Sequence, residues 1–356
     1  MELFREGGID FYAENVQLRK ASVFYNPGRE FDRCLNVLLV SSLGREGMSG
    51  LELFSGSGIR GLRLCRETGG FRSFDFNDLK SGGIIKKNLR KNKERLRVKT
   101  TVYGEDAEFF SSGTDYDYVD IDPFGSPVSY LDTAFSLLKK GGLLAVSATD
   151  TAALLGSAQG ACRRKYGSRS LKTAYSNEIG IRILIKKVAE AAAGHSIRVI
   201  PLLFNFEGNF IRIYFATSRS AGKVLIRNAY QCSRCPARTV AMRKTCSHCG
   251  SAMIEIGPLW LGRIYDKNTV GRMIHTLDGN RTFFSESMRI RLLGYLNRLS
   301  SEANVFSYYT TSEISSFLKS PEAKISDFKN PTVLSPKGFR TKMRFSDLVK
   351  TDFRNA

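Results

Sequence analysis

The sequence predicts an α/β fold in which helices cover a mostly parallel sheet. Three observations support this prediction. Between about residues 49 and 217, short apolar runs alternate with longer helix-like stretches. A glycine-rich turn follows the first of these runs, and acidic residues follow several others. The length of 356 residues favours two domains over one small core.

Each element of the fold is assigned from its residue pattern. The predicted strands are residues 50–54, 72–77, 100–103, 116–121, 142–148, 196–206 and 209–218. The predicted helices are residues 59–67, 81–97, 128–138, 161–166 and 177–193. Residues 204–210 have the composition of a hairpin turn. The last two strands are therefore expected to be antiparallel.

The charge of the chain points to a polyanionic partner. Lys and Arg number 54 against 34 Asp and Glu, a net charge of +20, which favours a nucleic acid or an anionic membrane surface. No apolar run approaches the roughly 20 residues that span a bilayer, and the N-terminus lacks the apolar region of a signal peptide. We therefore expect no membrane association and an intracellular protein, cytoplasmic or, in a eukaryote, nuclear.

The composition also suggests where the two domains meet. Residues 220–356 carry 22 Lys and Arg against 10 Asp and Glu, so this part is the more basic per residue. We predict one domain over residues 1–219 and a second over residues 220–356. The second is the better candidate for contacts to a nucleic-acid backbone.

The glycine-rich turn has the spacing G-x-G-x-x-G, formed by Gly56, Gly58 and Gly61. Such a turn lets a cofactor approach the backbone closely. A Walker phosphate loop is excluded because the Gly-Lys-Ser/Thr ending is absent.

Two cofactors, NAD and S-adenosylmethionine (SAM), remain possible for such a turn. Acidic residues at successive strand ends distinguish between them. Asp78 suits ribose hydroxyls, Asp106 suits an adenine amino group, and Glu52 lies near the cationic end of a ligand. SAM carries a sulfonium and an ammonium, whereas NAD carries a pyrophosphate that Glu52 would repel. The acids therefore favour SAM, with a set of solvated loop acids as the alternative. The candidate SAM-binding residues from this pattern are Glu52, Ser55, Gly56, Gly58, Asp78, Asp106 and Ala107.

The segment after the fourth predicted strand, Asp122-Pro123-Phe124, is suited to a flat base that carries an amino group. The carboxylate of Asp122 can accept a hydrogen bond or a proton from an exocyclic NH2. Proline presets the chain direction, which aims a backbone carbonyl at the same group, and Phe124 offers a stacking face. The alternative is a helix N-cap at Asp122 with proline at the first helical position.

Four cysteines have the spacing of a zinc site. Cys232 and Cys235 form one pair, Cys246 and Cys249 form another, and ten residues separate the pairs. Four thiolates suit one tetrahedral Zn2+ with a structural role, because no position is left open for catalysis. Four reduced structural thiols are the alternative. His248, between two of the ligands, is expected to be solvent-exposed and not to coordinate the metal.

The order of the motifs resembles that of the tRNA (guanine-26-N2)-dimethyltransferases. The matching motifs are Val23-Phe24-Tyr25-Asn26-Pro27, Arg33, the glycine loop 55–61, Asn77-Asp78, residues 120–127, Ala148-Thr149-Asp150, residues 177–184, residues 257–262 and residues 335–341. They span almost the whole chain. The sequence departs from the family pattern at Gly28 and Arg29, where bulkier apolar residues are expected.

This resemblance implies a class I, Rossmann-like SAM methyltransferase domain followed by a smaller α+β domain that is specific to the family and carries the four cysteines. It implies methylation of the exocyclic N2 of a guanosine in tRNA. By position, Asp122 matches the catalytic acid, Phe24 and Phe124 match the base-stacking aromatics, and Arg33 matches a cofactor contact, as do Asp78 and Asp106. A monomer is expected.

Two other functions stay open at this level. One is an amino-methyltransferase that acts on adenine N6 in DNA or rRNA, since that chemistry uses a similar Asp-Pro-aromatic segment. The other is a non-catalytic RNA-binding protein on a methyltransferase scaffold.

Overall fold

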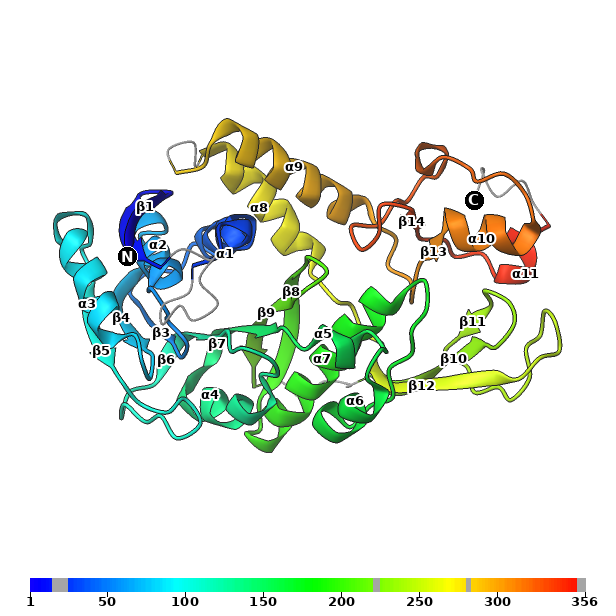
Figure 1. The fold of residues 1–356 in the computed structure, drawn as a ribbon, viewed down its shortest axis with the longest axis horizontal. Coiled ribbons are helices and arrows are strands. Elements are labelled where there is room, and N and C mark those ends of the chain that lie inside the picture. The colour runs from blue at the N-terminus through cyan, green and yellow to red at the C-terminus, as the bar shows by residue number, and fades with distance from the viewer. Residues whose placement is uncertain (15–24, 220–224, 280–282, 351–356) are drawn as a thin grey trace.

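A seven-stranded sheet forms the centre of the molecule in the computed structural model, which describes residues 1–14, 25–219, 225–279 and 283–350 (Figure 1). Its strands are β3 (Met48–Glu52), β4 (Phe71–Asn77), β5 (Lys99–Tyr103), β6 (Tyr116–Ile121), β7 (Leu138–Ala148), β8 (Arg198–Phe206) and β9 (Ile211–Ser218). The strand order is β5-β4-β3-β6-β7-β9-β8. Strands β3 to β7 pair in parallel. Strand β9 is antiparallel to both β7 and β8. The predicted α/β fold and the antiparallel final pair are confirmed.

Helices cover both faces of this sheet. The helices of this half are α1 (Glu30–Ser42), α2 (Ile59–Glu67), α3 (Gly82–Lys91), α4 (Leu131–Leu137), α5 (Thr151–Leu154), α6 (Gln159–Tyr166) and α7 (Ser176–Gly194), with short 3-10 turns η1 (Pro27–Arg29), η2 (Lys93–Arg95) and η3 (Val128–Tyr130). Helix α1 lies beside α2 and helix α4 beside α7, on opposite faces of the sheet (Figure 1).

Several elements of the first half differ from the sequence prediction, and the short helix α5 is one that was not predicted. Helix α1 was not predicted, although it is buried on nearly every side. The hairpin of β1 (Glu2–Glu6) and β2 (Ile9–Ala13) was also not predicted. The helix predicted over residues 81–97 ends at Lys91, because the side-chain amide of Asn92 bonds to the backbone of Asp10 in β2 and draws the chain aside.

The remaining elements form a smaller lobe and a helical pair. The strands are β10 (Ile226–Cys232), β11 (Arg238–Thr239), β12 (Met253–Trp260), β13 (Tyr309–Thr310) and β14 (Gly338–Phe339), and the helices are α8 (Lys267–Gly279), α9 (Glu286–Ser301), α10 (Thr311–Leu318), η4 (Ile325–Asp327) and α11 (Phe345–Leu348). Strands β10 to β12 and helices α10 and α11 gather at one end of the molecule (Figure 1). Helices α8 and α9 lie instead over α1.

Two hydrophobic cores follow this arrangement. The larger core joins the sheet and its helices to apolar residues of α8 and α9, such as Val270 and Leu296. The smaller core joins cysteines of the β10–β12 region to residues of the C-terminal segment, such as Ile314 and Phe345. The domain division at residue 219 stays a prediction, and it coincides with the end of β9 at Ser218.

A buried ion-pair network ties the two parts together. Arg340 bonds to Glu302 at 2.6 Å and to Glu178 of α7 at 2.8 Å. Arg182 donates to Glu178 and to the carbonyl of Trp260.

No helix among the described residues is long and apolar enough to cross a membrane.

Candidate active site

The glycine loop lies at the carboxyl end of β3, where the strand order changes direction between β4 and β6. Ligands of open α/β sheets bind in the crevice at such a switch point. Gly56 and Gly58 have φ of +54° and +77°, which other residues adopt only with strain. A Cβ on Gly61 would lie 2.5 Å from the ring of Phe76, so only glycine lets α2 pack this closely on β4. Each predicted glycine is therefore required by the geometry.

The acidic residues of the neighbouring strand ends fix the loop. Asp78 accepts a hydrogen bond from the N–H of Gly56 at 2.8 Å and from the N–H of Ser81 at 2.8 Å. Asn77 bonds to the backbones of Leu53 and Glu105, which links the ends of β3, β4 and β5. The predicted ribose-binding acid therefore also holds the glycine loop.

The predicted adenine end of the site is open to solvent. Asp106 is exposed, and its Oδ1 accepts from the N–H of Glu108 at 3.0 Å. Beside the two strand-end acids, Leu79 is 61% exposed and Phe109 is 79% exposed. These two apolar residues were not among the predicted site residues. Leu79 directly follows Asp78, and Phe109 follows Asp106 by three positions, so a large apolar side chain shortly after each strand-end acid was the available signal.

Glu52 is buried and one of its oxygens, Oε2, has no hydrogen-bond partner. Burial and the nearby carboxylate of Asp120 hold the pKa of Glu52 well above its ordinary value. A buried carboxyl group with an unpaired oxygen suits a ligand that carries positive charge. Oε2 lies beside Gly61 of α2, so the placement of Glu52 at the cationic end of a ligand stays a prediction. The glycine cradle fits SAM.

Asp122 follows β6 and lies among three guanidinium groups. Arg60 donates to its Oδ2 at 3.1 Å, and Arg29 donates to both of its oxygens at 3.1 Å. Arg212 lies 3.8 Å from Oδ2. Burial raises the pKa of Asp122, but the cations of Arg29, Arg60 and Arg212 outweigh burial and hold the pKa well below its ordinary value. Asp122 is therefore ionised at neutral pH.

The same arginines bind carboxylates behind Asp122. Arg60 also donates to Asp32 at 2.9 Å, and Arg212 bonds to Asp120 and lies 3.7 Å from Asp32. The roles of Asp32 and Arg212 were not predicted from the sequence. A charged residue within the apolar run of β9 was the available signal for Arg212, because such residues are buried only when they are paired.

The loop that carries Asp122 is fixed by hydrogen bonds to its neighbours. The N–H of Gly125 donates to the hydroxyl of Thr149 at 2.6 Å, and Ser126 donates to the hydroxyl of Tyr166 at 3.0 Å. Pro123 is buried, whereas Phe124 is 86% exposed. The next helical turn, η3, begins at Val128, so the alternative of a helix N-cap at Asp122 is excluded.

The resemblance also implied roles for Phe24 and Arg33, and the structure describes only the second of them. Phe24 lies outside the described residues. Arg33 is buried and bonds to Glu6 through two nitrogens, at 2.7 and 2.5 Å, and to the carbonyl of Asn26. Its role as a cofactor contact stays a prediction.

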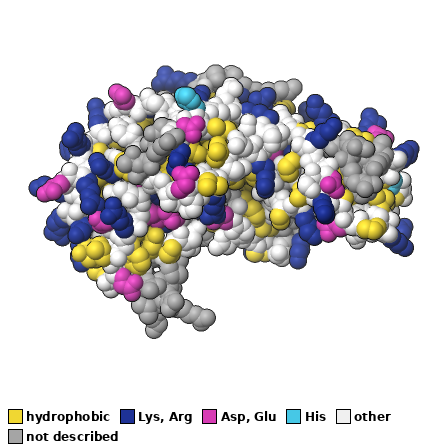
Figure 2. All heavy atoms as spheres, turned by 90° about the horizontal axis from the view of Figure 1, so that it is seen from above, with side chains coloured by type: hydrophobic (Ala, Val, Ile, Leu, Met, Phe, Trp, Pro, Cys, Tyr) yellow, Lys and Arg dark blue, Asp and Glu magenta, His cyan; other side chains and the backbone are white. Residues whose placement is uncertain are grey.

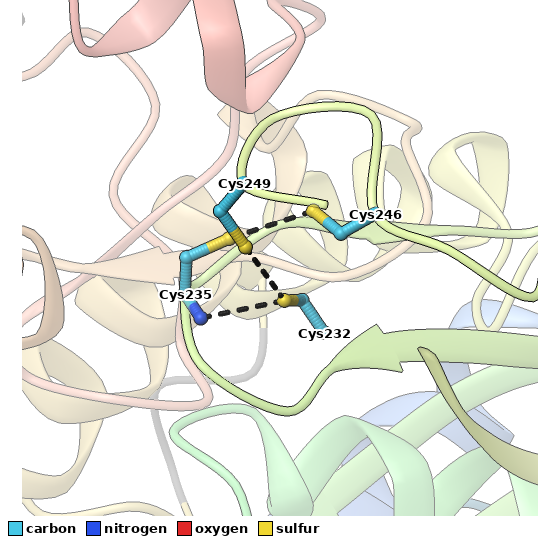
Figure 3. Close-up of side chains that lie close together, drawn as sticks. All are labelled: Cys232, Cys235, Cys246 and Cys249. Carbon is cyan, nitrogen blue, oxygen red and sulfur yellow. Dashed lines mark hydrogen bonds between the residues drawn. The ribbon is translucent and has the colours of Figure 1, made fainter. Parts of the chain in front are cut away.

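The four cysteines converge from two loops, and their sulfur atoms all lie within 4.8 Å of one another (Figure 3). Sγ of Cys232 lies 3.4 Å from that of Cys249, and Sγ of Cys235 lies 3.6 Å from that of Cys246. Four sulfurs at about 2.3 Å from a tetrahedral Zn2+ are roughly 3.8 Å apart, so the cluster fits zinc.

His248 lies outside the sulfur cluster and is half-buried. Its ring packs against Phe317 and Phe345, with centroid separations of 5.7 and 4.9 Å. His248 is therefore less exposed than expected, because the C-terminal aromatic residues pack against its ring.

Comparisons with known proteins agree on one family. A family described as N2,N2-dimethylguanosine tRNA methyltransferase matches residues 9–353. The tRNA (guanine(26)-N(2)/guanine(27)-N(2))-dimethyltransferase of Aquifex aeolicus is 31% identical over 381 residues, which cover 98% of this chain and 95% of that protein. The tRNA (guanine(26)-N(2))-dimethyltransferase of Methanothermobacter thermautotrophicus is 36% identical over 271 residues, 72% of this chain and 70% of that protein.

A solved structure has the same fold. Trm1 from Pyrococcus horikoshii, in complex with S-adenosyl-L-methionine, is similar with a TM-score of 0.86 and 24% sequence identity. The match covers 98% of this chain and 99% of that one.

Proposed function

Because this chain belongs to the N2,N2-dimethylguanosine tRNA methyltransferase family, we propose that it transfers methyl groups from SAM to the exocyclic N2 of guanosine 26 in tRNA. The observation that supports this most directly is the ionised carboxylate of Asp122 at the mouth of the sheet, next to the glycine loop of β3. Membership of the family along the whole chain also argues against adenine N6 methylation and against a non-catalytic scaffold.

We assign the cofactor site to the strand ends on both sides of the glycine loop. Gly56 and Gly58 admit the ligand, and Asp78 and Asp106 face its ribose and adenine. The exposed side chains of Leu79 and Phe109 offer an apolar surface for the adenine ring. Glu52 and Ser55 lie at the first strand end, and Ala107 lies next to Asp106. SAM supplies an electrophilic methyl group on a sulfonium.

Asp122 makes the amine reactive in this proposal. The N2 lone pair of guanine is delocalised into the ring, so the amine is a poor nucleophile. Hydrogen bonds from its N–H groups to Asp122 and to the carbonyl of Pro123 localise that lone pair on nitrogen. Nitrogen becomes positive as the new bond forms, and the negative charge of Asp122 stabilises it. A carboxylate with a depressed pKa still accepts the proton, because an alkylated, cationic N2 is far more acidic than a carboxylic acid.

The target base has to leave its stack in the tRNA to reach Asp122, which costs a few kcal/mol. We propose that stacking on Phe24 and Phe124 offsets this cost. The exposed ring of Phe124 beside the catalytic loop supports the proposal.

We further propose that the C-terminal half contacts the tRNA backbone and that the four cysteines hold a structural Zn2+. Arg234, Arg243 and Lys244 flank the cysteines and are exposed. Arg238 also flanks them in the sequence, but its side chain is buried and paired with Glu313, so it is not available to the tRNA. Figure 2 shows Lys and Arg side chains toward both ends of the molecule, with fewer Asp and Glu among them. This distribution suits an extended polyanion.

The proposal is tested by incubating the protein with SAM and an unmodified tRNA transcript that has guanosine at position 26. Nuclease fragments and nucleosides are then analysed by mass spectrometry. We expect monomethylated and dimethylated guanosine in the fragment that contains position 26. The same fragments report whether guanosine 27 is modified. Methylation of adenosine, or no methylation with SAM bound, would contradict the proposal.

A further inference from the structure

The side chain of Arg29 binds the carboxylate of Asp122, the proposed catalytic residue. Its Nη1 donates to Oδ1 and to Oδ2 of Asp122, at 3.1 Å each. Arg60, by contrast, donates only to Oδ2. Ser147 also makes a side-chain hydrogen bond to this carboxylate. Among the arginines in the described part of the chain, Arg29 is the one that donates to Oδ1, the oxygen that Arg60 leaves available to a substrate.

We propose that Arg29 is an internal placeholder for the target guanine, and that its side chain has to swing away from Asp122 before the base can bind. This inference rests on the proposed function, because it concerns the same carboxylate and the same amine.

The chemistry of the two groups supports the exchange. In guanine, C2 is bonded to N1, N2 and N3, which together form a guanidine unit within the ring. The arginine guanidinium is likewise flat and offers N–H donors along an edge that matches a carboxylate. The side chain and the substrate therefore compete for the same hydrogen-bond acceptor.

Phe210 holds the placeholder from its other face. The guanidinium carbon of Arg29 lies 3.9 Å from the ring centroid of Phe210. Phe210 is only 1% exposed, yet it belongs to neither of the hydrophobic cores found among the described residues. A cation–π contact thus replaces apolar packing at this ring.

The backbone of Arg29 is fixed, so only its side chain needs to move. The N–H of Arg29 donates to the carbonyl of Asn26 at 3.1 Å, and the side chain of Asn26 accepts from Gly28 at 2.9 Å. The side chain of Arg29 is 15% exposed and thus borders solvent. Rotation about its own bonds can carry the guanidinium outward without rearranging α1.

Departure of Arg29 also changes Asp122. Among the cations near this carboxylate, Arg29 depresses its pKa most, ahead of Arg60 and Arg212. Once Arg29 leaves, Asp122 keeps two cationic neighbours and becomes a better proton acceptor. The carboxylate is therefore most basic when the base has replaced the arginine.

The test uses a tRNA transcript in which 2-aminopurine replaces guanosine 26, because its fluorescence rises when the base leaves the stack. Arg29→Ala should lower the protein concentration at half-maximal signal by about 3- to 10-fold. In the wild type, the half-buried ion pair keeps most molecules in the state that cannot bind the base, and this lowers the apparent affinity by that factor. With the guanosine transcript and SAM, KM should fall by the same factor while kcat does not fall. Millimolar methylguanidine should restore the wild-type midpoint in Arg29→Ala by refilling the vacated position.

Arg45→Ala is the matched control. Arg45 bonds to the carbonyl of Gly141 near the start of β7, at the opposite end of the strands from Asp122. Its loss therefore changes the net charge equally without touching Asp122. Its midpoint should equal that of the wild type and should not respond to methylguanidine. Phe210→Leu should lie between Arg29→Ala and the wild type, because it loosens Arg29 without removing it.

A midpoint that is unchanged or higher in Arg29→Ala overturns the proposal, and so does a fall in kcat with KM unchanged. SAM calorimetry shows whether the variant is folded. If it is not, Phe210→Leu still has to lower the midpoint, and failure to do so overturns the proposal. A wild-type protein that does not methylate the guanosine transcript contradicts the proposed function instead.

Discussion

Arg60 and Asp122 are joined by a hydrogen bond of 3.1 Å from Nη2 to Oδ2, and the same nitrogen donates to Asp32 at 2.9 Å. One guanidinium from the helix after the glycine loop thus positions the carboxylate that follows β6. The glycine loop and the loop that carries Asp122 are mechanically coupled through this residue.

Arg60→Met should destabilise the protein by about 3–5 kcal/mol, because it leaves buried carboxylates without a cation. Urea unfolding monitored by circular dichroism measures the change. Arg5→Met is the control, since Arg5 is 74% exposed and lies 3.9 Å from Asp10; it should cost about 0–1 kcal/mol. Equal losses in the two variants would argue against the coupling.

Asp122→Asn should lower kcat by roughly 100- to 10,000-fold, the range for loss of a general base. Affinity for SAM, measured by calorimetry, should stay within a few-fold of the wild type. Asp117→Asn, at the other end of β6 and paired with Lys139, should keep its turnover. Wild-type turnover in Asp122→Asn would remove this residue from the mechanism.

Glu6 makes stability dependent on pH in the acid range. Burial raises its pKa, but Arg33 and Arg63 lower it to about 2 from an ordinary value of 4.5. A depressed folded-state pKa stabilises the protein above the unfolded pKa, and this contribution is lost as pH falls through the folded pKa. The shift corresponds to about 3 kcal/mol.

Glu6→Gln should therefore be less stable than the wild type at pH 6, and the difference should shrink as pH falls from 4.5 toward 2. Urea unfolding at several pH values measures it. A difference that stays constant with pH would show that Glu6 stabilises by packing alone.

Binding of SAM should release protons if Glu52 faces its positive charge. Burial raises the pKa of Glu52, with a further contribution from Asp120. A nearby cation favours the ionised form, so affinity should rise with pH through the pKa of the free protein. Calorimetry in buffers of different ionisation enthalpy counts the protons. Glu52→Gln should abolish the release; a release that persists in this variant would have another source.

Removal of zinc should loosen the smaller core selectively. Metal analysis of fresh protein should find about one zinc per chain. After chelation, trypsin should cut faster near Arg243 and Lys244, between the cysteine pairs, while the central sheet stays intact. Cys235→Ser should behave in the same way without chelator. Protein that contains no zinc and resists trypsin equally would leave four structural thiols as the explanation.

The sequence predicted those features whose signal is local. The positive φ angles of Gly56 and Gly58 follow from one short motif, and the meeting of the four cysteines follows from their spacing. Acidic residues at strand ends converge because parallel strands end at one edge of the sheet.

Features that depend on distant partners were not predicted. Asp32 and Arg212 come from separate elements, and no local pattern pairs them. Helix α1 is buried on nearly every side because helices α2, α8 and α9 pack against it, and α8 and α9 lie far away in the sequence. Arg29 was noted only as a departure, since its contact with Asp122 spans 93 positions of sequence.

Helices α8 and α9, which come late in the sequence, pack on the sheet and on α1, and this packing has a consequence for synthesis of the chain. Tyr295 of α9 donates to the carbonyl of Phe204 at 2.6 Å, and its ring meets Phe31 of α1 at 5.6 Å. When only the residues of the sheet have left the ribosome, helices α8 and α9 have not yet been made. The apolar surface of α1 that they bury therefore stays exposed to water until residues near 300 emerge. The smaller core needs residues from both before and after this pair of helices. Each core is thus closed by a segment made later, and the nascent chain has a long period in which chaperones can bind it.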